Sequence, residues 1–411
     1  MTVCFLRRPI CTAFPSLTRR LPHGPPVYSR ASLPTSFLAF PTLTTRVSAL
    51  TFSTFSSSSS TPPSIPNTRL RRARRPHVPQ RQEMRECRIA ILGPHDTPHM
   101  EELKHLPPEA KVVAQGNSLQ DFQSLDPSLL GSVDVLLLAP PAGRELLSSL
   151  WPSFTNLKWI HCIFAGVDHV LFPDLIHSSI PLTNARGLFS SSLAEYGVLA
   201  MSYFAKDLPR LLAQKAEKKW ERYCVEELRG ATLGIVGYGD IGQACGRLAK
   251  AFGMRVVALK RRPELGGKDG IADAVLGREK IDELIAQSDY LIVAAALTPD
   301  TRGIISAKEL ASAKPSLVII NMGRGPLLVE EDVIEALREG RVKGAAMDVF
   351  DTEPLPADHP YWEMPQVLLS PHNMDMTATF LFDSVRFFTE NCQRFVKGGA
   401  LRNLVDKKAG Y

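Results

Sequence analysis

A glycine-rich turn is the first feature of this sequence that could do chemistry. In the stretch GIVGYGDIGQACGRLAKAFGMRVVALKRR, a GxGxxG motif lies between a predicted strand and a predicted helix. Its first glycine permits a tight turn, its second lets the backbone approach a pyrophosphate, and its third lets the helix pack closely on the strand. Free N–H groups at the helix N-terminus then bind phosphate. The motif predicts a dinucleotide site formed by Gly237, Gly239, Asp240, Ile241 and Gly242.

Three cations, Lys260, Arg261 and Arg262, end the second strand of this motif. A site for NAD normally has a carboxylate there, which bonds the ribose 2′-hydroxyl. A carboxylate would repel the 2′-phosphate of NADP, whereas each charge-assisted hydrogen bond from a cation contributes about 1.5–3 kcal/mol. Two such bonds correspond to a preference on the order of hundreds-fold. We therefore predict NADPH as the preferred cofactor. The alternative is three solvated loop side chains, with similar affinity for NADPH and NADH.

Three further polar side chains lie at the ends of predicted strands. Arg324 lies in NMGRG, Glu353 in DVFDTEP and His372 in LLSPHN. Open α/β sheets bind ligands at the carboxyl ends of their strands, so these positions suit residues of a binding or catalytic site. Taken singly, each has a simpler interpretation: a surface arginine, an acidic residue at a helix start before Pro354, and a core histidine beside Pro371.

The elements that must position these residues form two series of short apolar runs, separated by helical patterns. Strands and helices in alternation predict parallel sheets covered on both faces. A long helical pattern at about 190–220 is expected to connect the two series, and an amphipathic stretch at about 378–397 is expected to cross back to the first. The predicted strands are 88–93, 111–116, 133–141, 158–166 and 180–187 in the first series, and 232–239, 255–260, 290–297, 317–323, 344–350 and 367–372 in the second.

The positive charge of the chain is concentrated at its start. The 82 residues before Glu83 hold twelve Arg, no Lys and no acidic residue, with Ser, Thr and Pro runs such as SSSSS at 56–60. Without those twelve charges, the net charge of +6 becomes about −6, so no nucleic-acid partner is predicted for the rest of the chain. The leader is typical of a transit peptide for the mitochondrion or the plastid. The alternative is a disordered basic tail.

Membrane and metal partners are not expected either. No apolar run approaches the ~18 residues needed to span a bilayer, so the body of the protein is expected to be soluble. The seven cysteines include no CxxC pair and no metal-ligand spacing. We interpret the five cysteines outside the leader as reduced residues, mostly in the core, in a reducing compartment, and we predict no metal site.

The glycine turn and the three polar residues, in this order, resemble the D-2-hydroxyacid dehydrogenase family. The similarity covers about 88–411 and includes AGVDHV, AEYGVLAM, LTPDTRGII and REGRVKGAAMDVFDTEPLPADHPYW. This chain departs from the family pattern at Ala296, usually a proline, and at Lys260, usually an aspartate. We predict an α/β protein of two lobes: after a leader at 1–82, a flavodoxin-like substrate domain at 83–189 completed by 376–411, a linking helical region at 190–227, and a Rossmann doubly wound dinucleotide-binding domain at 228–375.

The resemblance implies reduction of a 2-oxo acid by hydride transfer. His372 would give a proton to the nascent alkoxide, Glu353 would fix the tautomer of His372, and Arg324 would hold the carboxylate or polarise the carbonyl. The backbone N–H groups of Gly166 and Val167 would bind the substrate carboxylate from the other lobe.

Further cofactor contacts are also implied by the resemblance. Asp348 would accept a hydrogen bond from the nicotinamide carboxamide, and Thr301 with the backbone of Met322 and Gly323 would line the cofactor site. Asp168 and His169, although their pairing suggests catalysis, are interpreted as structural.

The expected substrate is glyoxylate or hydroxypyruvate, because NADPH favours the reductive direction. Alternatives within the family are a bulkier 2-oxo acid and a phosphoglycerate dehydrogenase-like reaction. An alternative of another class is an NAD(P)H-sensing, corepressor-like binding protein, because a fold does not fix a function. The resemblance further implies a homodimer.

Overall fold

The structure is a computed structural model that describes residues 86–139, 143–265 and 269–411. The predicted transit peptide at 1–82 lies outside the described residues, so the predicted organellar location stays a prediction. All the described residues belong to one unit of the chain, which begins at Val78. None of the helices in the described part is both long and apolar enough to cross a membrane.

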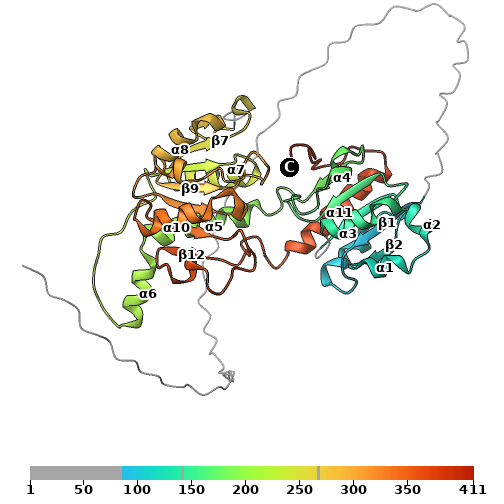
Figure 1. Ribbon diagram of the computed structural model, residues 1–411, viewed down its shortest axis with the longest axis horizontal. Helices are drawn as coiled ribbons and strands as arrows, with labels where there is room; N and C mark the ends of the chain where they lie inside the picture. Colours follow the sequence, from blue (N-terminus) through green and yellow to red (C-terminus); the bar gives the residue numbers. More distant parts are fainter. Residues whose placement is uncertain (1–85, 140–142, 266–268) are drawn as a thin grey trace, which may run out of the picture. The chain divides into compact units, whose positions relative to one another are not determined.

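Five parallel strands form the first sheet, in the order β2-β1-β3-β4-β5 (Figure 1). This 2-1-3-4-5 order is that of the flavodoxin-like fold, as predicted. Strand β3, with the sequence VLLL, is buried along its whole length, as expected for a strand covered on both faces. The strands are β1 Cys87–Leu92, β2 Ala110–Gly116, β3 Val135–Leu138, β4 Trp159–Cys162 and β5 Leu182–Asn184.

Helices cover both faces of this first sheet. Apolar side chains of α1 to α4 share one core cluster with the strands. On the other face, α11 packs with β1 and β4, and Phe388 stacks on Trp159 with ring centroids 5.4 Å apart. The helical elements are η1 Pro98–His105, α1 Leu119–Gln123, α2 Pro127–Gly131, α3 Arg144–Leu150, η2 Trp151–Ser153, α4 Pro173–His177 and α11 Phe380–Val396.

Seven parallel strands form the second sheet, in the order β12-β11-β10-β9-β6-β7-β8. Counted from β6, this is the 3-2-1-4-5-6 order of the Rossmann fold with one strand added, which confirms the predicted fold class. Strand β8 was not predicted; it lies at the edge of the sheet and is only half-buried, so no long apolar run marks it. The strands are β6 Thr232–Val236, β7 Arg255–Leu259, β8 Ala274–Leu276, β9 Tyr290–Val293, β10 Val318–Asn321, β11 Gly344–Met347 and β12 Val367–Leu369.

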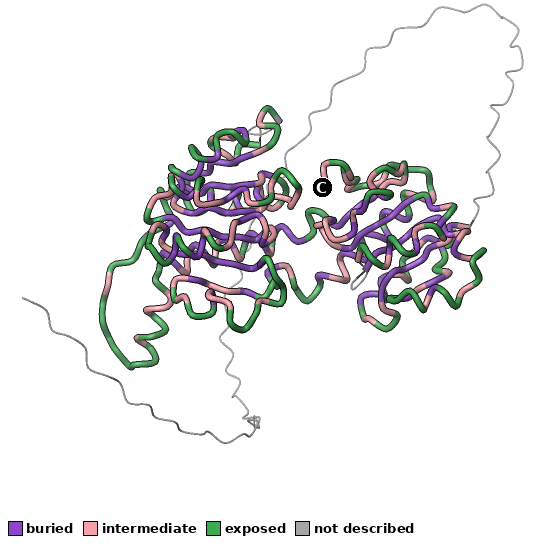
Figure 2. The backbone as a smooth tube through the Cα atoms, viewed as in Figure 1, coloured by how far each residue is buried: buried purple, intermediate pink, exposed green. Residues whose placement is uncertain are grey.

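Helices also cover both faces of the second sheet. One face packs against α5 (Ser190–Ala205) and α7, and the other against α8, α9 and α10. Figure 2 shows the burial following the strands of both sheets, with exposed residues in the helices and loops. The helical elements are α7 Asp240–Ala251, η3 Pro263–Leu265, η4 Arg278–Lys280, α8 Ile281–Gln287, α9 Ala307–Leu310, η5 Gly325–Leu327, α10 Glu330–Arg338 and η6 Pro360–Glu363.

The linking segment differs from the continuous helical pattern that the sequence predicted. It forms two helices, α5 Ser190–Ala205 and α6 Leu208–Ala216, and the helical structure ends before residue 220. Asp207, between them, adopts a left-handed conformation with φ 50°, and its side chain accepts a hydrogen bond from the backbone of the new helix. Pro209 has no N–H to continue the first helix, so the break has a local cause. Figure 1 shows α6 and the following loop extending away from the second sheet.

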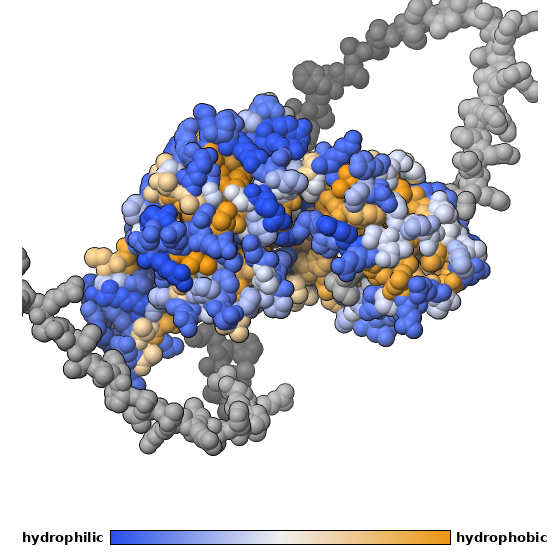
Figure 3. Space-filling view, viewed as in Figure 1, coloured by the Kyte–Doolittle hydropathy of each residue, from blue (hydrophilic) through white to orange (hydrophobic). Residues whose placement is uncertain are grey.

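The surface is mixed in polarity. On the face drawn in Figure 3, hydrophilic residues predominate and hydrophobic ones gather in separate patches. Side chains that are both large and apolar are nevertheless exposed in the linking segment, notably Leu212 (56 % exposed), Trp220 (97 %) and Val225 (51 %).

Candidate active site

The glycine turn joins β6 to α7, and each of its glycines has a steric reason. Gly237 has φ +99°, and a Cβ atom there would lie 2.5 Å from the backbone nitrogen of Ala295. A Cβ atom on Gly242 would overlap the carbonyl oxygen of Gly237. Nothing lies within 4 Å of the corresponding point on Gly239. The first and third glycines therefore permit the close packing of turn, strand and helix, and the second leaves open space, as a bound pyrophosphate requires.

Helix α7 begins directly at this open space. Gly239 is its N-cap residue, so Asp240 and Ile241 stand in the first turn, where backbone N–H groups have no partner within the helix. Asp240 forms an ion pair of 3.2 Å with Arg186 of the first lobe. The pair brings a positive side chain to the end of the helix at which a phosphate would bind.

The three cations lie where β7 ends. Lys260 follows the last strand residue, and its backbone N–H donates to the carbonyl of Leu276 at 3.0 Å. Its side chain is partly exposed, and those of Arg261 and Arg262 are exposed. The guanidinium carbon of Arg261 lies 5.1 Å from the ring centroid of Tyr411. The open space at Gly239 and the exposed cations after β7 together fit a dinucleotide with a 2′-phosphate.

Two other residues predicted near the cofactor use their side chains within the protein. The hydroxyl of Thr301 donates to the carbonyl of Ala296 and accepts from the N–H of Thr298, which closes the loop after β9. Met322 is buried in the core, with its sulfur 3.9 Å from that of Cys245. Any contact that Met322 makes with a cofactor is therefore through its backbone, as the sequence indicated.

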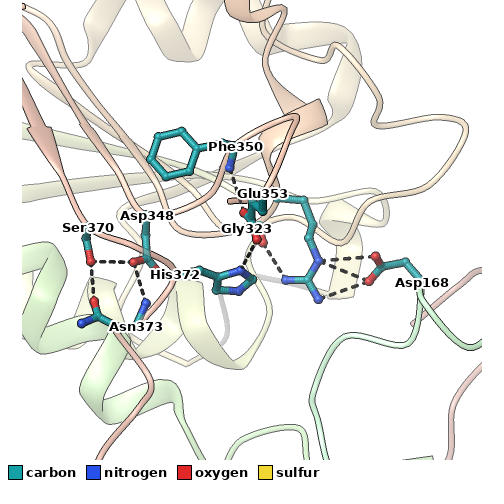
Figure 4. Close-up of polar contacts among 9 residues, drawn as sticks. Asp168, Gly323, Asp348, Phe350, Glu353, Ser370, His372 and Asn373 are labelled. Carbon is teal, nitrogen blue, oxygen red and sulfur yellow. Dashed lines mark hydrogen bonds and ion pairs between the residues drawn. The ribbon is translucent and has the colours of Figure 1, made fainter. Parts of the chain in front are cut away.

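Asp348 lies just beyond β11 and is almost fully buried. Its Oδ1 atom accepts hydrogen bonds from Ser370 Oγ at 2.7 Å and from the N–H of Asn373 at 3.0 Å. Burial raises the pKa of Asp348 above its usual value. The two donors hold the loop that carries His372 against the end of β11 (Figure 4).

The predicted acid–base residues converge because their strands are neighbours. Arg324 follows β10, Glu353 follows β11 and His372 follows β12, and these strands are adjacent in the sheet. His372 Nδ1 donates to Glu353 Oε2 at 2.8 Å, and Glu353 Oε1 accepts from the N–H of Phe350 at 2.9 Å. Both oxygens of the carboxylate are thus engaged, which fixes the histidine ring and its tautomer (Figure 4).

The backbone at His372 is held in a strained conformation. Its φ is 52°, in the left-handed region that a residue other than glycine seldom adopts. Such strain persists where the surrounding structure fixes the residue, and here the Glu353 bond and the Asp348–Asn373 bond flank it. His372 is also partly open to solvent, with a side chain 41 % exposed. The ring is therefore held firmly and is accessible to a ligand.

Arg324 is held by partners from both lobes. Its NH1 atom donates to the carbonyl of Gly323 at 2.8 Å, and its NH2 atom lies 3.2 Å from Asp168 Oδ1. A Cβ atom on Gly166 would overlap the guanidinium, so only glycine permits this approach. Gly166 and the adjacent Val167 donate no hydrogen bond to a backbone carbonyl in the described part of the chain. Two N–H donors beside an arginine form a suitable site for a carboxylate.

Two features of this region did not follow from the sequence: the partner of Asp168 and the burial of Asp375. A structural role for Asp168 follows from the sequence, but its partner does not: Asp168 forms an ion pair with Arg324, 156 residues away. Asp375, three residues after His372, is half-buried, and burial raises the pKa of its carboxyl. No motif predicts either feature. Among the described residues, no group of three or more His, Cys, Asp or Glu side chains could hold a metal ion.

Comparison with known proteins gives a consistent result. The sequence model of the D-isomer specific 2-hydroxyacid dehydrogenase NAD binding domain matches residues 198–373. A hydroxypyruvate reductase of Blautia hydrogenotrophica is 28 % identical over 310 residues, which cover 72 % of this chain and 92 % of that protein.

Solved structures agree in fold. A family member from Klebsiella pneumoniae has a TM-score of 0.62 and 30 % identity, covering 80 % of this chain and 99 % of the other. An NADPH-dependent glyoxylate/hydroxypyruvate reductase of Sinorhizobium meliloti, in complex with NADP and sulfate, has a TM-score of 0.66 and 26 % identity, covering 79 % and 100 %.

These matches, with the two sheet orders, define an NAD(P)-dependent oxidoreductase of two α/β lobes. The chain belongs to the D-isomer-specific 2-hydroxyacid dehydrogenase family. The resemblance noted in the sequence is thereby confirmed, and the activity of the protein is that of a 2-hydroxyacid dehydrogenase.

Proposed function

We propose that the protein reduces glyoxylate or hydroxypyruvate to the D-2-hydroxy acid with NADPH. The observation that carries the proposal is the His372–Glu353 hydrogen bond of 2.8 Å, between the loops that follow β12 and β11, with Arg324 in the loop that follows the next strand, β10. The relatives named as hydroxypyruvate and glyoxylate reductases support the substrate class.

In this reaction the bound dinucleotide supplies a hydride to the carbonyl carbon. His372 then has to supply a proton to the carbonyl oxygen. Because Nδ1 of His372 is bonded to Glu353, the proton given to the substrate comes from Nε2. Glu353 orients the ring through this bond, and its own bond to the N–H of Phe350 keeps the carboxylate in place.

Arg324 and the backbone around Gly166 orient the substrate. The guanidinium and the two N–H groups at Gly166 and Val167 carry donors that match the two oxygens of a carboxylate. With the carboxylate held, the neighbouring carbonyl oxygen lies near both Arg324 and His372. A fixed cation there also stabilises the negative charge that develops on that oxygen.

Asp168 is expected to affect the reduction indirectly, by holding Arg324 in position for the substrate. The substitution Asp168→Asn removes the charge of the ion pair and keeps the size of the side chain. Since the pair is partly exposed, we expect kcat/KM for glyoxylate to fall about 3- to 10-fold, which corresponds to about 0.7–1.4 kcal/mol. NADPH affinity should not change. Asp174→Asn, at an exposed acid of α4, is the control; an equal loss in both variants would contradict this role.

The preference for NADPH is proposed from the cations after β7. The side chains of Lys260, Arg261 and Arg262 are accessible to solvent at the end of β7. In an NAD site, an acidic side chain that binds the ribose 2′-hydroxyl stands at this position. The Sinorhizobium meliloti reductase, whose structure holds NADP, is a relative with the same fold.

The substrate is tested by turnover with a series of 2-oxo acids. The full chain is mixed with NADPH, and the loss of nicotinamide absorbance is followed with glyoxylate, hydroxypyruvate and phenylpyruvate. We expect the highest kcat/KM with one of the first two. A higher value with phenylpyruvate would instead support the bulkier class of substrate. NADPH binding without turnover of any 2-oxo acid would support a sensing protein.

We also propose that the protein is a homodimer in which the linking segment forms the interface. Leu212, Trp220 and Val225 expose apolar surface there, and such surface is typical of association sites. Trp220→Asp should convert a dimer to a monomer in size-exclusion chromatography with light scattering. A wild-type protein that elutes as a monomer at micromolar concentration would contradict the proposal.

A further inference from the structure

The tail segment of the chain, residues 403–411, runs from the first lobe to the cation site of the second. Leu404 pairs antiparallel with Thr183 of β5, and the N–H of Val405 donates to Leu182 at 2.8 Å. The side chain of Asn403 donates to the carbonyl of Arg186 at 2.7 Å. The tail therefore extends the edge of the first sheet in a defined register.

Lys407 anchors the middle of the tail. Its ammonium group lies 2.7–2.9 Å from four oxygens, the carbonyls of Leu175, Ser178 and Ile180 and the hydroxyl of Ser178. Partial burial lowers the pKa of Lys407, but the carbonyl oxygens around it satisfy its three N–H donors. These four contacts fix the position of Lys407, the residue after Asp406, at which the last turn begins.

The last turn directs Tyr411. The carbonyl of Asp406 accepts from the N–H groups of Gly410 at 2.8 Å and Tyr411 at 3.3 Å, and the N–H of Asp406 donates to the carbonyl of Tyr411 at 3.0 Å. Gly410 has φ +82°, and a Cβ atom there would lie 3.4 Å from the methyl group of Thr298 in the second lobe. The turn thus closes on itself and lies against the loop after β9.

The ring of Tyr411 lies beside Arg261, one of the three cations. The distance of 5.1 Å from the guanidinium carbon to the ring centroid is within the range of a cation–π interaction. An exposed arginine otherwise moves among many rotamers, and ordering it on binding costs entropy. Contact with an aromatic ring uses none of the guanidinium's N–H donors in a hydrogen bond, so they stay free for a phosphate.

We propose that Tyr411 is a positioning residue for cofactor selection, which holds Arg261 in the orientation that binds the 2′-phosphate of NADPH. This inference rests on the proposed preference for NADPH. It goes beyond that preference because the orientation of Arg261 depends on Tyr411. This residue lies 150 positions away, in the tail that is anchored to the first lobe. NADH, which has no 2′-phosphate, should not depend on this contact.

The test measures both cofactors with three variants of the full chain. Tyr411→Ala removes the ring, Tyr411→Phe keeps it, and Leu404→Ala shortens an exposed side chain of the same tail. We expect Tyr411→Ala to raise KM for NADPH roughly 3- to 5-fold, as for loss of an exposed cation–π contact, with KM for NADH and kcat unchanged. The other two variants should match the wild type. In an Arg261→Ala background, Tyr411→Ala should have no further effect.

Several results would overturn the inference. One is an equal rise in KM for both cofactors, which would indicate a general effect on the fold or on adenine binding. Another is the same KM for NADPH in the Ala variant and the wild type. Direct titration of NADPH and NADH by nicotinamide fluorescence gives Kd values without turnover. A wild type that binds the two cofactors equally would refute the proposed cofactor preference itself, whereas a wild-type preference that Tyr411→Ala leaves intact would refute only the role of Tyr411.

Discussion

His372→Ala should lower kcat for glyoxylate reduction by about 10²- to 10⁴-fold, the usual contribution of a general acid. The variant loses the Nε2 proton donor, and Glu353 loses its partner at 2.8 Å. The Kd for NADPH should stay within about twofold of the wild-type value, because the glycine turn and the cations are untouched. Steady-state kinetics and a fluorescence titration of NADPH measure the two quantities.

A second histidine–glutamate pair provides the control for this prediction. His359 Nε2 lies 2.9 Å from Glu330 Oε1 in the same lobe, and neither residue is assigned to the reaction. His359→Ala should lower the Tm and leave kcat within about twofold of the wild type. If His372→Ala retained wild-type kcat, or if both variants lost activity equally, His372 would not be the proton donor.

The second large effect concerns the choice of cofactor. The double substitution Lys260→Asp/Arg261→Ala should reverse the preference, so that kcat/KM with NADH exceeds that with NADPH. Two charge-assisted bonds to the 2′-phosphate are lost, each worth about 1.5–3 kcal/mol, so NADPH should lose on the order of 10²-fold or more. The new aspartate can bond the ribose 2′-hydroxyl of NADH. Measurements with both cofactors at one ionic strength show the reversal.

Net charge has to be separated from direct contact in that experiment. The exposed cations Arg394, in the last turn of α11, and Lys397, just after that helix, permit the same change of charge elsewhere, as Arg394→Ala/Lys397→Asp. This control should shift kcat/KM for the two cofactors by similar small factors. An equal loss of NADPH preference in both double variants would mean that long-range attraction sets the preference.

Much of the fold followed from the sequence because its signals are local. Each predicted apolar run contains a strand, and the alternation of strands with helical patterns determines two parallel sheets. The break between α5 and α6 was missed although Pro209 marks it, because the apolar pattern continues through that position. Strand β8 was missed because it is a half-buried edge strand, paired only with β7 among the described strands, and lacks the long apolar run that marks the other strands.

The site was predictable to the extent that its residues follow strands. Parallel strands bring their carboxyl ends to one edge, so Arg324, Glu353 and His372 could be expected to converge without knowledge of their distances. The partners from the first lobe could not be predicted in this way. The contacts of Asp168 with Arg324 and of Tyr411 with Arg261 depend on how the loops and the tail fold, and no spacing in the sequence encodes them.

The proposed function of this family member is the NADPH-dependent reduction of a small 2-oxo acid. Its most direct test is the ratio of kcat/KM for NADPH to that for NADH, measured on the full wild-type chain with saturating glyoxylate and then with hydroxypyruvate. We expect turnover with at least one of the two acids and a ratio on the order of 10² or more. Turnover with a ratio near one would contradict the assignment of the three cations, and no turnover of either acid would contradict the proposed reaction.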